Sequence, residues 1–390
     1  MNRPYSTYWK GKGNSVKRVV HCINLHDVGG VQQMFVPFYE RAKEESSFFH
    51  SVVGLGECDE QFVGIDRYVN LTASFFHQLQ FIRSLIDRET IVHFHNMLGG
   101  KKIAALLHWL PVKNVVFTDQ GASWYCNDSN RSNYIRNAQV SRWIIANSKA
   151  TQTMLHTNAE VPMDKIQVIY NGFLRSTQAR ISEEPTDRGI QVGYIGRFAA
   201  FKGVHILIES ARRLLGEKDI SFSIAGSGGC EDRLRENAKD LSNVTFVGKV
   251  SDPLRFISEM DIIVVPSTRE PIPNVIVEAG FMKKAVISAN VDGIPEQIEN
   301  GKTGVLLPCE KSVTYRDALY PDVVVDPALH VLRKPQEIDA LLLADAIKAL
   351  AHDAKSRKRY GEALYEKVTE QHSFDTYFTS VEKMYAGMVN

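Results

Sequence analysis

Short apolar runs rich in β-branched residues alternate with longer stretches of mixed polarity along most of the chain. The stretches at 30–45, 75–86 and 100–110 have the spacing of amphipathic helices. Strands that alternate with helices predict βαβ units and parallel sheets. The predicted strands are 18–25, 51–55, 91–95, 115–118, 143–146 and 167–170 in the first half, and 191–195, 221–225, 244–247, 262–265 and 285–288 in the second.

The length of the chain and one polar segment predict two domains. A chain of 390 residues suits about two domains of ordinary size. Residues 176–189 are polar without a clear period and contain Pro185, which is typical of a linker. We therefore expect residues 1–175 and 190–371 to form two Rossmann-like, doubly wound α/β domains facing each other across a cleft. Residues 372–390 are predicted to form a helix that crosses back to the first domain.

Ligands of such sheets bind at the carboxyl ends of the strands, so the site is expected in the cleft. One stretch breaks the alternating pattern. Residues 308–335 are long and irregular, which indicates an insertion, and the sequence gives it no role.

Charge and cysteine content exclude several classes of protein. Lys and Arg number 46 and Asp and Glu 45, a formal net charge of +1, which argues against a bulk nucleic-acid binder. No apolar run reaches the ~20 residues needed to cross a bilayer, and residues 1–18 lack the apolar core of a secretory signal. The five cysteines are scattered without a C-x-x-C pair, so neither a disulfide framework nor a zinc site is indicated. We expect a cytoplasmic protein.

Three glycine-containing loops follow predicted strands and precede helices. Gly29 and Gly30, in the segment 26–31, let a backbone approach a ligand, and the amides of a helix start favour phosphate. Arg197 and Lys202 in the second loop suit a diphosphate clamp. The third loop begins at Gly226 and is an incomplete dinucleotide fingerprint. For each loop the plain alternative is a tight turn or a pair of solvated cations.

Two glutamates form the strongest pattern. Glu270 lies in a loop after the strand 262–265, and Glu278 lies in a helical stretch with seven residues between the two. A carboxylate at Glu278 can bind vicinal hydroxyl groups, and Glu270 can face the cleft. The alternative is a pair of surface acids, but the neighbours of Glu278 are apolar, which makes full solvation less favourable.

In this order and spacing, the motifs resemble a family 4 glycosyltransferase with the GT-B fold. The resemblance covers nearly the whole chain and is densest from 192 to 307. The residues that carry it are Gly29-Gly30, Asn171-Gly172, Gly196-Arg197, Lys202-Gly203, Ala225-Gly226-Ser227-Gly228, Phe246-Val247-Gly248, Asp261, Pro266-Ser267, Glu270, Glu278, Asp292-Gly293-Ile294-Pro295-Glu296 and Gly301-Lys302-Thr303-Gly304.

The resemblance implies a role for each donor-side residue. Arg197 and Lys202 hold the diphosphate of a sugar nucleotide, Glu278 binds the ribose and Glu270 lies at the transferred sugar. Gly29, Gly30 and Gly226 are also implied in donor binding, and the backbone near Lys249–Val250 borders the base.

The resemblance also implies retaining transfer. Arg197 and Lys202 stabilise the charge that grows on the departing phosphate, which accepts the proton. The sequence contains no D-x-D, so no metal and no other cofactor is expected. Gln120 stands where the family often has His and cannot act as a general base, and Asp119 is the nearest residue that could. Pro271 to Pro273 replaces a common glycine and aromatic residue, which puts the shape of the sugar pocket in doubt.

His93 and His95 lie two apart on one face of a predicted strand. A zinc site would need a third ligand, and the sequence does not identify one. The resemblance makes His95 and Asn96, together with Asp119, candidates for the acceptor side, whereas His93 suits a packed strand-end histidine.

We therefore expect a retaining, metal-independent hexosyltransferase that acts in cell-surface polysaccharide biosynthesis. Its partners are a nucleotide-diphosphate sugar and a glycan or lipid-linked glycan acceptor. UDP is the expected nucleotide, with GDP open. The alternatives are a sugar-nucleotide epimerase of GT-B fold and a non-catalytic sugar-nucleotide binder.

Basic residues predict that the protein works at the anionic inner membrane surface. The alternative is scattered, solvated charge. The basic residues concerned are Arg3, Lys10, Lys12, Lys17, Arg18, Arg131, Arg136 and Arg142.

Overall fold

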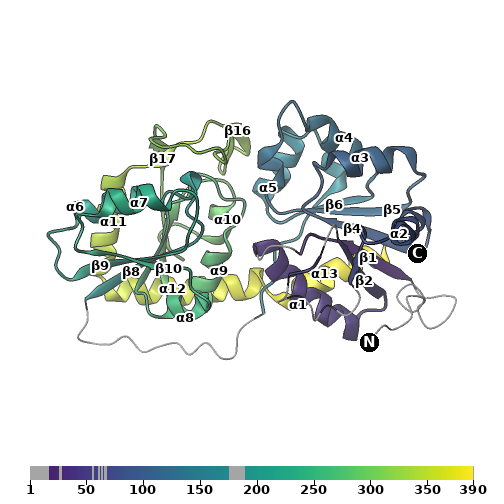
Figure 1. The fold of residues 1–390 in the computed structure, drawn as a ribbon. Helices are drawn as coiled ribbons and strands as arrows, with labels where there is room; N and C mark the ends of the chain where they lie inside the picture. Colours follow the sequence, from purple (N-terminus) through teal and green to yellow (C-terminus); the bar gives the residue numbers. More distant parts are fainter. Residues whose placement is uncertain are drawn as a thin grey trace. The chain divides into compact units, whose positions relative to one another are not determined.

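The computed structural model describes residues 17–25, 29–54, 57–59, 62, 65, 68–174 and 189–389. The chain divides into two compact α/β units (Figure 1). Met1–Leu174 and Phe374–Asn390 form the first unit, and Arg175–Ser373 forms the second. Except for Gly189, the predicted linker lies outside the described residues.

The first unit is built on a seven-stranded sheet in which every pair of neighbours is parallel. The strand order is β3-β2-β1-β4-β5-β6-β7, so the order reverses between β1 and β4. The strands are β1 Arg18–Cys22, β2 Phe49–Gly54, β3 Tyr68–Asn70, β4 Thr90–His95, β5 Asn114–Asp119, β6 Trp143–Ala146 and β7 Ile166–Val168.

Helices cover both faces of this sheet. Alternate strand residues point to opposite faces, so Val20 enters a core that contains Phe81 of α2 and Leu107 of α3, whereas Val19 enters a core that contains Phe38 of α1. The C-terminal helix α13 packs in that second core through Tyr385. The helices are α1 Gly30–Glu45, α2 Phe75–Ile86, α3 Lys101–Trp109, η3 Ala122–Tyr125, α4 Arg131–Val140, α5 Lys149–Thr157, η4 Met163–Lys165 and α13 Phe374–Ala386.

The second unit contains a six-stranded parallel sheet with the order β10-β9-β8-β11-β12-β13. Its order also reverses, between β8 and β11. The strands are β8 Ile190–Ile195, β9 Ile220–Ala225, β10 Val244–Gly248, β11 Ile262–Val265, β12 Ala285–Ala289 and β13 Val305–Leu307. The helices are η5 Ala200–Lys202, α6 Val204–Arg213, α7 Glu231–Ala238, α8 Pro253–Ser258, α9 Asn274–Phe281, α10 Ile294–Gln297, α11 Ala340–Ala351 and α12 Ala354–Gln371.

These two sheets confirm the predicted α/β fold of two Rossmann-like halves. The sequence pattern missed the edge strands β3 and β13, each of three residues. The stretch 308–335 is also more regular than expected. It contains β14 Cys309–Lys311 and the antiparallel pair of β15 Val324–Asp326 with β16 Val331–Arg333, and β14 pairs with β17 Glu337–Ile338.

Candidate donor-binding site

In the second unit, the loops that follow β8 and β9 pack backbone against backbone. Gly226 has φ +138°, and a Cβ atom there would lie 1.9 Å from the carbonyl oxygen of Gly196. The Phe198 amide donates to the Ser227 carbonyl at 2.8 Å, and the Gly226 amide donates to the Gly248 carbonyl at 2.8 Å. These loops leave no room for a side chain at position 226. Their packing alone therefore requires a glycine there, whether or not a ligand binds.

Both predicted phosphate-binding cations lie in the β8–α6 loop. Arg197 is exposed, and its guanidinium contacts no acceptor or carboxylate in the described part of the chain. Lys202 ends the turn η5 and its ammonium group pairs with the carboxylate of Glu270. Gly203 then opens α6 with φ +70°. The loop therefore presents one open cation and one paired cation at the carboxyl end of β8.

Glu270 is buried and held from three sides. Its side chain is bonded to Lys202 and accepts a hydrogen bond from Ser267 Oγ at 3.1 Å. Its backbone amide donates to Asp292 Oδ2 at 2.7 Å. A carboxylate fixed in this way beside a cation can face a bound sugar with its position set in advance.

Asp292 is a site residue to which the sequence pattern gave no role. It has φ +48° and is 1% exposed, and its second oxygen accepts from the Val325 amide at 2.6 Å. Burial raises the pKa of this carboxyl to about 7, although the amides of Val325 and Glu270 oppose the shift. Asp292 links the Glu270 loop to β15. The only sequence signal was its place in the motif 292–296.

Glu278 lies on α9 and is partly buried. Burial raises the pKa of its carboxyl to about 7. Its side chain has no hydrogen-bond partner among the residues that the structure describes, whereas Ile276, Val277 and Ala279 beside it are buried in the core. A carboxyl that is partly desolvated and without a partner is suited to receive hydroxyl groups of a ligand.

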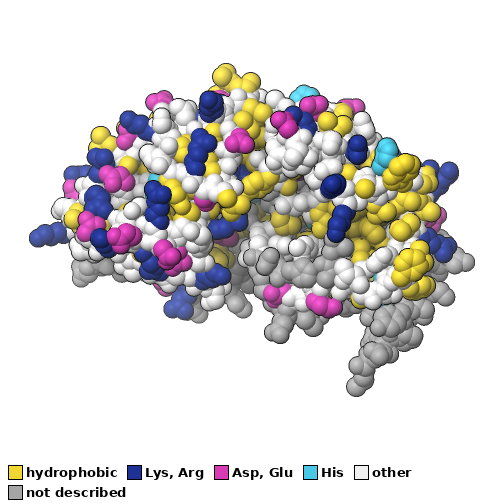
Figure 2. All heavy atoms as spheres, turned by 45° about the horizontal axis from the view of Figure 1, so that its top comes forward, with side chains coloured by type: hydrophobic (Ala, Val, Ile, Leu, Met, Phe, Trp, Pro, Cys, Tyr) yellow, Lys and Arg dark blue, Asp and Glu magenta, His cyan; other side chains and the backbone are white. Residues whose placement is uncertain are grey.

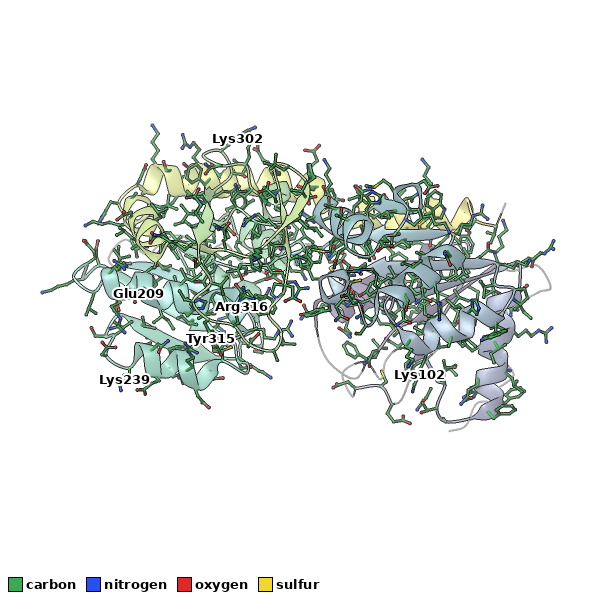
Figure 3. The ribbon with its side chains drawn as sticks, turned by 90° about the horizontal axis from the view of Figure 1, so that it is seen from above. Lys102, Glu209, Lys239, Lys302, Tyr315 and Arg316 are labelled. Carbon is green, nitrogen blue, oxygen red and sulfur yellow. The ribbon has the colours of Figure 1, made fainter. Side chains whose placement is uncertain are left out.

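The stretch 308–335 contacts three of these loops. Asp317 Oδ2 accepts from the Ala200 amide in η5 at 2.8 Å, and Tyr320 OH donates to Thr268 Oγ1 at 2.8 Å. Val325 completes the set through Asp292. Tyr315 of the same stretch (labelled in Figure 3) lies against α7, where the Arg233 guanidinium is 3.9 Å from the centre of its ring. The insertion therefore braces the candidate site, a role that its sequence did not reveal.

The other donor-side candidates are less distinctive. Val250 is half-buried and follows β10, next to the Gly226 loop. In the first unit, Gly30 begins α1, and the Gly29 amide donates to Gln32 Oε1 at 3.1 Å. Gly29 has an extended backbone with φ −132°, which does not require glycine. The preceding residues 26–28 lie outside the described residues.

The acceptor-side candidates lie at the carboxyl ends of β4 and β5. Asn96 Oδ1 accepts from the Gln120 amide at 3.1 Å, so these two residues are neighbours. Asp119 is fully buried and accepts from the Gly121 amide at 2.8 Å and from Ser123 Oγ at 3.2 Å. Asp119 thus holds a turn. It lies on the opposite face of the sheet from His95, because His95 pairs with Thr118 and successive residues alternate.

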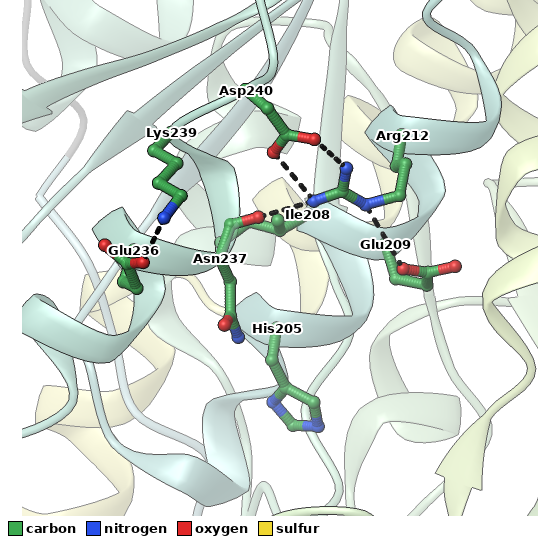
Figure 4. A pocket seen from close by; sticks show the side chains of 8 residues that line it. All are labelled: His205, Ile208, Glu209, Arg212, Glu236, Asn237, Lys239 and Asp240. Atoms are coloured by element: carbon green, nitrogen blue, oxygen red, sulfur yellow. Dashed lines mark hydrogen bonds and ion pairs between the residues drawn. The ribbon is translucent and has the colours of Figure 1, made fainter.

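A separate pocket lies between α6 and α7 on the second unit (Figure 4). Its charged groups are paired with one another. Arg212 Nη1 bonds Asp240 at 2.5 Å and Lys239 bonds Glu236 at 2.5 Å. Because these charges are already compensated, we assign no ligand to this pocket.

Two doubly wound Rossmann-like sheets, with a glycine-containing, cation-bearing loop at the carboxyl end of β8, define an α/β protein of a class that binds ligands at this edge of the sheet. Residues 189–320 match the family model described as glycosyl transferases group 1. The resemblance to family 4 glycosyltransferases is confirmed, and the chain carries a glycosyl transferases group 1 domain.

Curated relatives and solved structures agree with this assignment. The chain is 27% identical over 199 residues to the Staphylococcus aureus capsular polysaccharide biosynthesis glycosyltransferase CapM, covering 50% of this chain and 45% of that protein. It is 33% identical over 153 residues to the Streptomyces kanamyceticus alpha-D-kanosaminyltransferase, covering 37% and 40%. These matches thus span less than half the length of either relative.

The fold is similar to that of Anabaena HepE, solved in complex with UDP and with UDP-glucose. The TM-score is 0.72 at 18% identity in both comparisons, over 95% of this chain and 99–100% of HepE. This likeness confirms the predicted GT-B fold.

Proposed function

We propose that the protein is a retaining glycosyltransferase that moves a hexose-type sugar from UDP to a glycan or lipid-linked glycan acceptor. The observation that carries the proposal is the grouping of open Arg197, the Lys202–Glu270 pair and unpartnered Glu278 on the loops and helix after β8 and β11. HepE binds UDP and UDP-glucose on a similar fold, and CapM is named for capsular polysaccharide biosynthesis.

The donor's charged and polar parts each find a chemical match. Arg197 and Lys202 bind the diphosphate, and Lys202 exchanges its partner Glu270 for phosphate oxygen when the donor arrives. The Glu278 carboxyl accepts hydrogen bonds from the ribose hydroxyls. Lys249 and Val250 border the base, beside the loop of Gly226.

In the transfer step, the bond between sugar C1 and the diphosphate oxygen breaks through an oxocarbenium-like state. Arg197 and Lys202 stabilise the charge on the leaving diphosphate, and Glu270 faces the sugar. The acceptor hydroxyl attacks from the same face, its proton passes to the leaving phosphate oxygen, and Gln120 positions the sugar by hydrogen bonding. We propose that the two cations replace a metal ion and that no cofactor is needed.

Incubation with UDP-sugars and a panel of acceptors tests the function. We expect UDP release that depends on acceptor, an axial-to-axial or equatorial-to-equatorial outcome at C1 by NMR, and full activity in EDTA. Glu270→Ala should cut turnover more than donor affinity, and Glu278→Ala the reverse. Epimerised donor without acceptor would favour the epimerase, and binding without any transfer would favour a non-catalytic binder.

We propose that the protein is cytoplasmic and works at the anionic inner face of a membrane. Among the described residues, no helix is long and apolar enough to cross a bilayer. Apolar side chains gather on part of the surface that Figure 2 shows. In the first unit, Phe75 and Phe76 of α2 are 73% and 57% exposed and Trp109 of α3 is 83% exposed. Exposed Lys101 and Lys102 begin α3. Aromatic and basic side chains together suit a lipid interface.

The basic residues named from the sequence contribute less than expected to this surface. Arg142 donates to the carbonyls of Met388 and Gly387, and Arg131 pairs with Asp128. Arg3, Lys10 and Lys12 lie outside the described residues. We expect wild-type protein to float with anionic liposomes and Phe75→Ser/Phe76→Ser to float less. Equal flotation of both would contradict this surface.

A further inference from the structure

Four histidines of the first unit are gathered on one face of its sheet. His21 lies on β1, His50 on β2, and His93 and His95 on β4, and their side chains are 0–7% exposed. The register pairs His21 with His93 and His50 with Val19, which puts all four on the face covered by α1 and α13. Of the four, only His95 was a candidate for the acceptor side, and the proposed function gives none of them a role.

Three of these imidazoles form a hydrogen-bonded chain that ends at a carboxylate. His95 Nε2 lies 3.1 Å from His21 Nδ1, and His21 Nε2 lies 2.9 Å from His50 Nδ1. His50 Nε2 lies 2.9 Å from Ser46 Oγ, which donates to Glu382 Oε2 at 2.6 Å. Glu382 lies on α13, within the same unit. The chain therefore runs from the carboxyl end of β4 through the core to a helix.

The hydrogen bonds of Ser46 determine which nitrogen carries the proton on each imidazole of the chain. Ser46 Oγ has one proton, which goes to Glu382, and it already accepts from the Phe48 amide at 3.0 Å. His50 Nε2 must therefore carry a proton. A neutral imidazole has one N–H and one lone pair, so His50 Nδ1 accepts from His21 Nε2, and His21 Nδ1 in turn accepts from His95 Nε2.

Burial favours the neutral form of these rings. It lowers the pKa of His21 and His93 well below the ordinary value, and the neighbouring imidazoles act in the same direction. Burial alone lowers the pKa of His95 to about 3. Glu382 Oε1 is 3.6 Å from His50 Nε2, beyond hydrogen-bond distance, so the hydrogen-bonded link between the two runs through Ser46.

His93 belongs to a different set of contacts. Its Nδ1 lies 2.5 Å from Tyr385 OH and its Nε2 lies 2.6 Å from Thr118 Oγ1. It stacks on His95 with ring centres 4.1 Å apart. His93 thus supports the ring of His95 without taking part in the chain.

We propose that this chain, from Glu382 through Ser46, His50 and His21, fixes His95 in the Nε2–H tautomer, so that its Nδ1 lone pair accepts a hydrogen bond from a hydroxyl group of the acceptor next to the one that attacks. The role at the hydroxyl rests on the proposed function. No hydrogen bond reaches His95 Nδ1 from the described residues, and His95 ends β4 beside Asn96 and Gln120. His21, His50, Ser46 and Glu382 are positioning residues.

The tautomers are measured without any substrate. Long-range ¹H–¹⁵N spectra of protein labelled at histidine should show Nε2–H on His95, His21 and His50, assigned by comparison with His95→Asn and His50→Asn. Ser46→Ala should convert His95 to a mixture of both tautomers, and Ser46→Thr should restore the single form. Ser380→Ala is the matched control, since its hydroxyl donates to the Thr376 carbonyl within α13.

A kinetic test distinguishes an effect on acceptor binding from an effect on donor binding. We expect Ser46→Ala to raise the KM for acceptor about tenfold, the loss of roughly one well-placed hydrogen bond, with the KM for donor close to wild type. The melting temperature should also fall, because the Phe48 amide and His50 lose their acceptor. Glu382→Gln should show a smaller rise of the same kind.

Three results would overturn the inference. The first is Nδ1–H on His95 with His50 as an imidazolium, which is the same chain with reversed polarity. The second is stoichiometric zinc in the purified protein, lost in His21→Asn, since His21, His93 and His95 are near enough to share an ion. The third is unchanged ring signals in Ser46→Ala. If the tautomers are as expected but no acceptor is glycosylated, the role at the hydroxyl fails together with the proposed function, and the tautomer assignment stands.

Discussion

The two units have sheets of the same kind but carry their chemistry in different ways. In the second unit, the candidate groups lie on loops after β8 and β11, where short stretches of sequence bring glycines and charges together. In the first unit, the polar groups that stand out are buried histidines contributed by β1, β2 and β4. Functional groups on one loop can therefore be identified from a short stretch of sequence. Groups that meet on a sheet face can be identified only when the order of the strands is known.

The largest expected effect concerns the backbone packing of the second unit. Gly226→Ala should destabilise that unit by ~3 kcal/mol or more, because the new Cβ atom would lie 1.9 Å from the Gly196 carbonyl oxygen. Chemical unfolding measures this change. Gly229→Ala is the control, since no atom lies within 4 Å of the added Cβ. Similar stability of the two variants would refute the packing argument.

The next effect concerns the cations of the β8–α6 loop. Lys202→Ala and Arg197→Ala should each weaken UDP-sugar binding by ~1.5–3 kcal/mol, the usual cost of removing a charged hydrogen-bond donor. Isothermal titration calorimetry measures the affinity. Lys302→Ala removes an exposed lysine that pairs with Glu299 and should leave the affinity unchanged. Unaltered donor affinity in both loop variants would contradict the proposal that these two cations bind the diphosphate.

The third prediction concerns Gln120 in the first unit. Gln120→Ala should lower turnover by raising the activation free energy ~1–3 kcal/mol through the loss of a polar contact, with little change in the free energy of unfolding. Asp119→Asn should instead lower stability, because Asp119 holds the turn at Gly121 and Ser123. Turnover and melting temperature are measured for both variants. A collapse of activity in Asp119→Asn at unchanged stability, with Gln120→Ala near normal, would assign the function to Asp119.

Glu278 predicts a pH dependence of stability. Its folded pKa, raised to about 7, exceeds the unfolded value of about 4.3, so the folded state binds more protons between these values. Stability should therefore be greatest below about pH 4 for this group and decline as the pH rises toward 7. Glu278→Gln should flatten the decline between about pH 5 and pH 8 by ~1–2 kcal/mol. An equally steep decline in the variant would show that the pH dependence comes mainly from Asp292, whose pKa is also raised to about 7.

The smallest effect tests the brace from the insertion. Asp317→Ala should weaken donor binding by about 1 kcal/mol, since the Ala200 amide in the turn that positions Lys202 loses its acceptor. Asp322→Ala, an exposed aspartate in the same stretch, is the control. Equal donor affinity in these two variants would mean that the insertion stabilises the fold without acting on the site.

The sequence by itself determined the α/β class, the two Rossmann-like halves and the order of the loops that bear Arg197, Lys202, Glu270 and Glu278. These features are local, because strand and helix periods and glycine turns are written in consecutive residues. The sequence did not predict the short edge strands β3 and β13.

Only the tertiary structure decided which distant residues meet. His21 and His50 join His95 because the parallel register of β1, β2 and β4 aligns them, and no sequence spacing encodes that register. Asp292 links Glu270 to Val325, and Asp317 reaches Ala200 across 117 positions of sequence. Asp119, a candidate base by its residue type, proved to hold a turn. Hydrogen bonds between groups far apart in sequence form only when the fold brings both partners together, and they decide the role of each side chain.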